Sequence, residues 1–186
     1  MTIEKPLQVI NKMVEDGIIK NYAICGAMGA MFYIESTSTD DIDIIISFNA
    51  PPSALISLGP IYQYLLNKGY VEYKHAGIMI EGWEVQFLPT ADKLDEESLV
   101  NARLIALPMG ESSVPVRVFK PEYLVANALK IGRPKDLIRV TSFINLKAVN
   151  LNKLKDVLLR HDMVNMWKMF CNRVGISDPK IKGLIQ

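Results

Sequence analysis

A run of isoleucines that follows three acids is the feature of this sequence that most limits how the chain can fold. The segment TSTDDIDIII places Asp40, Asp41 and Asp43 directly before the isoleucines 44–46. β-Branched residues favour strands, and strand side chains alternate between two faces, so Asp41 and Asp43 share one face. Burying a bare carboxylate costs several kcal/mol, roughly. We therefore expect a strand over Asp41–Phe48 whose two carboxylates are either solvated or neutralised by a cation.

The spacing of Asp41 and Asp43 suits a single hard cation. Mg²⁺ prefers oxygen ligands, keeps several waters and often binds one or two carboxylates together with substrate phosphates. Aspartates at the start of a strand are also common as solvated turn residues. The pair alone leaves both interpretations open and favours the solvated one.

The segment YAICGAMGAMFYI, just upstream, shifts that balance towards phosphate chemistry. It predicts a strand over Tyr22–Cys25, a turn at Gly26 and a helix over Gly26–Ile34. Free N–H groups at a helix N-terminus bind phosphate, and glycine lets a phosphate approach the backbone closely. A lone glycine is more often only a tight turn. The order of elements nevertheless predicts a phosphate site beside the aspartate pair.

The remaining chain divides into a mixed first part, residues 1–120, and a helical second part, residues 121–186. We therefore predict an α+β fold, with a central mixed β-sheet flanked by helices and followed by a C-terminal helical region. Apolar spacing and Gly or Pro breakers predict the other elements. Helices are expected over Pro6–Asp16, Pro60–Asn67, Asp95–Ala102, Glu122–Ile131, Pro134–Leu146, Leu151–His161 and Met163–Val174, and strands over Tyr70–Lys74, Gly77–Glu81, Trp83–Leu88, Arg103–Leu107 and Val114–Phe119.

The composition of the chain limits its expected cellular location and binding partners. No run of about 18 uncharged apolar residues is present, so no membrane partner is expected. Cys25 and Cys171 are far apart in the sequence and fit a reducing cytoplasm. The first 100 residues hold 6 Lys and Arg against 14 Asp and Glu, and the rest of the chain holds 15 against 6. An acidic half could hold a cation and a basic half could meet phosphate or nucleic acid, although the two halves could equally face each other.

These motifs together resemble a known superfamily. The order G-A-x-G-A, T-x-D-I-D-I, GWEVQFLP (82–89) and KPEYLVANALKIGRPKDLIRVTSFI (120–144) is similar to the nucleotidyltransferase superfamily with the polymerase-beta-like fold. It looks closest to small stand-alone members akin to the abortive-infection toxin nucleotidyltransferases. The resemblance covers the chain from Tyr22 to about Phe170.

The resemblance implies a nucleoside triphosphate substrate, such as ATP, and a metal cofactor, Mg²⁺ or Mn²⁺. Asp41 and Asp43 would be the catalytic metal ligands. Gly26, the Ala27 backbone and Thr39 would contact the nucleotide. An acceptor hydroxyl would attack the α-phosphorus, with the metal neutralising developing charge. Ala27 stands where the family usually has Gly or Ser, so a hydroxyl contact to phosphate is lost while the backbone contacts remain.

A third polar position is expected on the strand Trp83–Leu88. Gln86 matches it best; its carbonyl can ligate a hard cation but cannot accept a proton. Glu84 shares the same face by alternation and could take the catalytic role if the pairing register shifts. Glu84 could equally be a solvated strand residue, and the sequence does not choose between these interpretations.

A basic stretch in the second part could supply charge to the triphosphate. The residues concerned are Lys130, Arg133 and Lys135, with Asp136 orienting Lys135 or Arg139 under the resemblance. The same residues could form an ordinary helix end with basic C-terminal and acidic N-terminal residues.

The sequence therefore predicts a cytoplasmic nucleotidyltransferase acting on RNA, a protein hydroxyl or a small molecule. An antitoxin-like partner would fit the resemblance, and both a monomer and a small homo-oligomer fit the sequence. Two alternatives stay open. One is a nucleotide- or partner-binding module of the same fold without chemistry. The other is a nucleic-acid adaptor that uses the basic helices.

Overall fold

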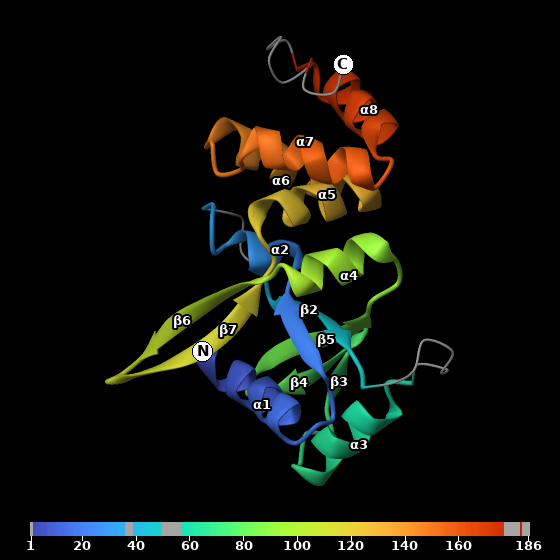
Figure 1. Ribbon diagram of the computed structural model, residues 1–186. Coiled ribbons are helices and arrows are strands. Elements are labelled where there is room, and N and C mark those ends of the chain that lie inside the picture. The colour runs from blue at the N-terminus through green and yellow to red at the C-terminus, as the bar shows by residue number, and fades with distance from the viewer. Residues whose placement is uncertain (1, 36–38, 50–56, 177–182, 184–186) are drawn as a thin grey trace. The chain divides into compact units, whose positions relative to one another are not determined.

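The chain forms one β-sheet and eight helices in the residues that the structure describes (Figure 1). The computed structural model describes residues 2–35, 39–49, 57–176 and 183. Contacts group the chain into two compact units, Met1–Gly29 with Ser38–Phe119 and Ala30–Thr37 with Lys120–Gln186. Each unit is described by itself below.

The first unit is built on a seven-stranded mixed sheet. Its strand order is β3-β4-β5-β2-β1-β7-β6, in which β2 pairs in parallel with β5 and β1 in parallel with β7, while the other pairs are antiparallel. The strands are β1 (Asn21–Ile24), β2 (Asp41–Ser47), β3 (Tyr73–Lys74), β4 (Gly77–Ile80), β5 (Trp83–Pro89), β6 (Arg103–Met109) and β7 (Ser112–Val118).

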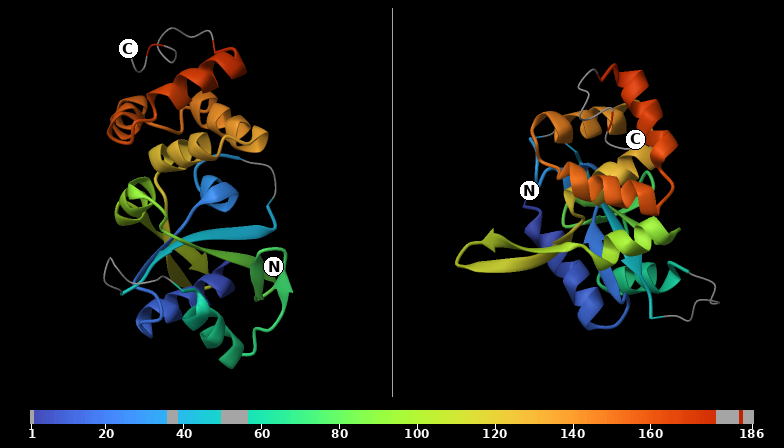
Figure 2. Two further views of the ribbon diagram at one scale, coloured as in Figure 1. Left: turned by 90° about the vertical axis from the view of Figure 1, so that its right-hand side faces the viewer. Right: turned by 45° about the horizontal axis from the view of Figure 1, so that its top comes forward.

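Helices cover both faces of this sheet. Figure 2 shows α1 (Glu4–Glu15) and α3 (Gly59–Asn67) on one face and α4 (Lys93–Val100) on the other, and α2 (Gly26–Ala30) follows β1. The core on one face is formed by alternate residues of β2, where Ile42, Ile44 and Ile46 are all fully buried. The opposite face of β2 therefore carries Asp41 and Asp43, both half-buried.

The β6–β7 hairpin joins the rest of the sheet only at its base. Within the described residues β1 and β7 share a single paired position, Ile24 with Val118, and the hairpin then projects from the sheet (Figure 1). β6 is an edge strand whose side chains are alternately exposed and half-buried; Leu104, for example, is exposed.

The second unit is helical: α5 (Pro121–Ile131), α6 (Pro134–Asn145), α7 (Leu151–Arg160) and α8 (Val164–Val174). Proline occupies the first turn of α5 and of α6, where its missing N–H costs nothing, and Gly132 ends α5 in the left-handed conformation. Trp167 and Phe143 are fully buried, so this unit has a core of its own. No helix in the described ranges is long and apolar enough to cross a bilayer.

The mixed sheet with flanking helices confirms the predicted fold class, and the bounds of one helix and three strands are corrected. The helix expected over Gly26–Ile34 ends at Ala30, and turns follow in which Tyr33 and Ile34 donate to the Ala30 carbonyl. The strand expected over Tyr70–Lys74 shrinks to Tyr73–Lys74 because only these two residues pair with β4. Both hairpin strands extend to a two-residue turn, since pairing continues to Met109 and Ser112.

The inward face of β2 should dominate the stability of the first unit. Ile44→Ala removes a fully buried side chain from the centre of the sheet and should lower the free energy of unfolding by about 2–5 kcal/mol. Leu104→Ala, on an edge strand with the side chain 65% exposed, should cost less than about 1 kcal/mol. Urea unfolding followed by circular dichroism compares the two, and equal costs would contradict this assignment of the core.

Candidate functional site

The acidic end of β2 lies next to β5, and the register between the two strands decides which polar residues meet. β2 and β5 run in parallel, with Asp41 beside Glu84 and Asp43 beside Gln86. Residues in register on neighbouring strands share a face, so four polar side chains occupy one face of the sheet. Gln86, rather than Glu84, is therefore the neighbour of Asp43.

Glu84 is buried and hydrogen-bonded at both carboxylate oxygens. Its Oε2 lies 3.0 Å from Nδ1 of His75, and its Oε1 accepts from Nε2 of Gln86 at 3.3 Å. The hydrogen bond from His75 lowers the pKa of Glu84, with a smaller contribution from Gln86, while burial opposes the shift. Glu84 is thus not the solvated strand residue that the sequence left open, since only 4% of it is exposed.

Gly26 forms the turn between β1 and α2 and lies against the carboxylate of Asp43. Its φ of +58° is in the left-handed region, which glycine adopts without a side-chain clash. A Cβ built on Gly26 would lie 3.1 Å from Cβ and from Cγ of Asp43, and closer still to Oδ2. The neighbouring Cys25 N–H donates to the Asp43 carbonyl at 2.9 Å, which holds the turn beside β2. The absence of a side chain at Gly26 is therefore what leaves space for Asp43.

Thr39 and Ala27 are the other two residues that were predicted to contact the nucleotide near β2. The Thr39 hydroxyl donates to Oδ1 of Asp41, so its contact is to the carboxylate. Ala27 is half-buried in α2, which has only five residues. Such a short helix has a smaller dipole than the predicted nine-residue helix, so backbone N–H groups, more than a macrodipole, are what this turn offers to an anion.

One of the three predicted basic residues, Arg133, contacts a buried acid in the second unit. Asp136 is fully buried; it accepts from Nε of Arg133 at 2.7 Å and from Nη1 of Arg139 at 3.2 Å. Lys130 and Lys135 are exposed. The expectation that Asp136 orients Lys135 or Arg139 resolves to Arg139, and Arg133 joins it. Arg139 was named only as a possible partner of Asp136 and was not among the predicted nucleotide-binding residues; its position three residues after Asp136 on a helix suits the pair.

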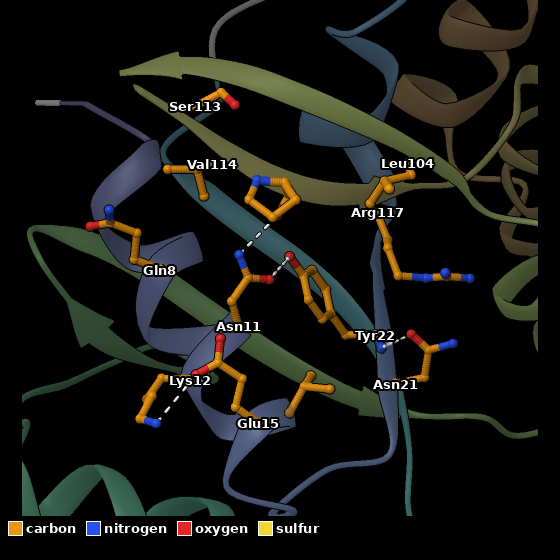
Figure 3. A pocket seen from close by; sticks show the side chains of 12 residues that line it. Gln8, Asn11, Lys12, Glu15, Asn21, Tyr22, Leu104, Ser113, Val114 and Arg117 are labelled. Atoms are coloured by element: carbon orange, nitrogen blue, oxygen red, sulfur yellow. Dashed lines mark hydrogen bonds and ion pairs between the residues drawn. The ribbon is translucent and has the colours of Figure 1, made fainter. Parts of the chain in front are cut away.

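A separate hollow of the first unit has a volume of about 500 Å³ and lies between α1, β1 and the β6–β7 hairpin (Figure 3). Its central polar groups bind one another: Tyr22 donates to Asn11 Oδ1 at 2.7 Å, and Asn11 Nδ2 donates to the Pro115 carbonyl at 2.8 Å. Burial raises the pKa of Tyr22. Strand alternation places Tyr22 on the face opposite Asp43, so this hollow is not the acidic site.

The structure is similar to a solved nucleotidyltransferase-like protein. The crystal structure of an antigenic nucleotidyltransferase-like protein from Paracoccidioides brasiliensis superposes with a TM-score of 0.53 at 15% identity, covering 99% of this chain and 93% of that chain. At the sequence level the chain matches no protein-family model and no curated protein. The similarity therefore shows a nucleotidyltransferase-like fold.

The fit between Gly26 and Asp43 yields a direct test. Gly26→Ala should destabilise the protein by about 1–3 kcal/mol more than Gly17→Ala, because its new methyl group would strike the Asp43 carboxylate. Gly17 is the matched control, since its φ of +73° imposes the same backbone strain and no atom lies within 4 Å of the position of its Cβ. Urea unfolding measures both variants.

The double variant Gly26→Ala with Asp43→Ala should recover most of this additional loss, because the carboxylate that clashes is gone and only the contact with Cβ of residue 43 at 3.1 Å remains. Additive costs in the double variant would show that the two residues do not meet.

Proposed function

We propose that this protein is a Mg²⁺-dependent nucleotidyltransferase that moves a nucleoside monophosphate from a nucleoside triphosphate to an acceptor hydroxyl. The observation that carries the proposal is the placement of Asp41 and Asp43 on one face of β2 against the Gly26 turn, in a fold similar to that of a nucleotidyltransferase-like protein. Fold similarity alone would not support a function, so the proposal depends on these side chains.

The donor atoms on this face fit Mg²⁺ or Mn²⁺. Asp41, Asp43 and the Gln86 amide offer only oxygen as ligand atoms, which hard cations prefer. Among the described residues no three His, Cys, Asp or Glu side chains converge on a common metal position. An incomplete protein cage suits Mg²⁺, which keeps several waters and takes substrate phosphates as ligands.

Each acidic residue is held by a neighbour that fixes its direction. Thr39 donates to the Asp41 carboxylate, and the Cys25 N–H and the Gly26 turn restrain the strand and side chain of Asp43. A bound cation would supply Lewis-acid stabilisation of the charge that develops on the phosphoryl oxygens. The acceptor oxygen would form a bond to the α-phosphorus while the bond from that phosphorus to the bridging oxygen breaks. Pyrophosphate would leave, and the proton of the acceptor hydroxyl would pass to water.

Lys130, Arg133 and Lys135 are the residues that we propose for the triphosphate charge. Arg133 has two of its nitrogens on the Asp136 carboxylate, and its side chain is 54% exposed, so the guanidinium edge remains accessible to solvent. We further propose an RNA acceptor, since the basic residues concentrate after residue 100. A protein or small-molecule acceptor would change the acceptor substrate and leave the nucleotidyl-transfer chemistry unchanged. An antitoxin-like partner in the cytoplasm would also leave this chemistry unchanged.

A binding module of the same fold is the second candidate, and a single observation favours it. Gln86, which cannot take a proton, is the residue beside Asp43. A module of this kind would bind nucleotide stoichiometrically and release no pyrophosphate, which separates it from the enzyme.

Neutralising the aspartates should remove nucleotide binding and turnover without unfolding the protein. Asp41→Asn and Asp43→Asn should each weaken Mg²⁺-dependent binding of nucleoside triphosphate by at least about 100-fold, because each removes a charged metal ligand. Calorimetry with each nucleoside triphosphate, with and without Mg²⁺, measures binding, and pyrophosphate release measures turnover.

Asp40→Asn is the matched control, because Asp40 is an exposed acid that precedes β2. It should bind and turn over nucleotide as the unaltered chain does. Full turnover in both site variants would rule out this mechanism.

A further inference from the structure

We propose that His75 and Glu84 are positioning residues that hold the side-chain amide of Gln86 with its oxygen available to the cation bound by Asp41 and Asp43. This inference rests on the proposed function and extends it to two residues that would not touch the substrate. It assigns Glu84 a role as an anchor rather than as a metal ligand.

The hydrogen bond between Gln86 and Glu84 determines which end of the amide is presented. A carboxylate only accepts hydrogen bonds, so its partner at 3.3 Å must be the nitrogen Nε2 of Gln86. The amide oxygen is then at the other end of the same group. Because Gln86 is in register with Asp43 on the neighbouring strand, that oxygen belongs to the face that carries the aspartates.

Glu84 is itself fixed from the side of β4. Its carboxylate lies 3.0 Å from the His75 ring, and its stem lies over Gly77. A Cβ at Gly77 would come within 2.6 Å of Cγ of Glu84, so a larger residue at that position would displace this side chain. With one oxygen on His75 and the other on Gln86, both carboxylate oxygens are engaged in hydrogen bonds.

His75 occupies a turn position that glycine would fill with less strain. It lies in the two-residue connection between Lys74 and Gly77, which pair with each other, and its φ is +49°. A left-handed conformation strains the backbone of a residue that carries a Cβ. Burial does not explain a histidine at this position, because its side chain is 75% exposed. Its contact with Glu84 is the interaction that gives this side chain a role, and backbone strain of this kind concentrates at functional sites.

The test is a titration of the full chain with Mn²⁺ in the absence of nucleotide. Electron paramagnetic resonance measures the concentration of free Mn²⁺. Glu84→Ala should lower the Mn²⁺ affinity about 10-fold, the range found when a residue that orients a metal ligand is lost. Gln86→Leu should lower it at least as far. Glu84→Gln should keep most of the affinity, because its carbonyl can still accept from Gln86 Nε2 although its charge is gone.

A second pair of variants tests His75 without disturbing the turn. Glycine and asparagine both tolerate a left-handed backbone. The side-chain amide nitrogen of asparagine is separated from Cα by the same number of bonds as Nδ1 of His75. His75→Asn should therefore keep the hydrogen bond to Glu84 and the affinity for Mn²⁺. His75→Gly should lose affinity as Glu84→Ala does, with a similar midpoint of urea unfolding to that of His75→Asn. If Glu84→Ala does not fold, this pair decides the question.

The outcomes separate this inference from the proposed function. If the unaltered chain binds Mn²⁺ in a manner that Asp43→Asn abolishes, while Glu84→Ala and His75→Gly bind normally, the positioning role is wrong and the metal site stands. An equal loss in Glu84→Gln and Glu84→Ala would show that Glu84 acts through its charge, which also overturns the positioning role. If the unaltered chain binds Mn²⁺ only in the presence of a nucleoside triphosphate, the same variants are compared in that complex. If it binds Mn²⁺ in neither condition, the metal-dependent function fails, and the inference fails with it.

Discussion

The burial of three isoleucines on one face of β2 is the constraint on which the rest of the site depends. Ile42, Ile44 and Ile46 are fully buried, and the alternate positions 41 and 43 carry the aspartates. Slipping the pairing by one residue would turn the carboxylates into the core and the isoleucines outward, at a cost of several kcal/mol, roughly, for each charge. Hydrophobic burial therefore fixes the register of a central strand, and that register places the polar groups of the site beside one another.

Local sequence pattern predicted the parts of the site that depend on one strand or one turn. Alternation correctly placed Asp41 and Asp43 on a shared face, and the strand–glycine–helix order located the turn at Gly26. The length of the following helix could not be predicted, because the apolar run GAMGAMFYI has no charge or proline that marks where the helix stops. The fold class followed from the same alternation of strands and helices, and the structure confirms it.

The neighbours across the sheet could not be predicted in the same way. The choice between Glu84 and Gln86 depends on how β5 aligns with β2, and the intervening chain, residues 48–82, leaves that alignment undetermined by local pattern. The sequence assigned His75 no functional role for a related reason. Its partner, Glu84, is nine residues away across a strand pair, and no spacing rule in the sequence joins a turn residue to that position.

Buried carboxylates serve in both units to hold other side chains. Glu84 bonds His75 and Gln86 in the first unit, and Asp136 bonds Arg133 and Arg139 in the second. An acid that is buried and fully hydrogen-bonded has little freedom left, so it can fix the direction of a partner more firmly than a solvated acid could. Removing such an acid would leave unpaired donors behind, which costs more than the hydrogen bond itself contributes.

An amide at the third position also changes the charge of the proposed site. Two aspartates would balance the charge of one divalent cation, and Gln86 would add a ligand atom without adding charge. A third carboxylate ligand would make the same site more negative and would repel the approaching triphosphate. The carboxylate of Glu84 is instead stabilised by the hydrogen bond from His75 and is held against the β3–β4 turn. Under the proposed function, the chain would thereby keep three oxygen-bearing side chains on this face while reducing the electrostatic cost of binding an anionic substrate.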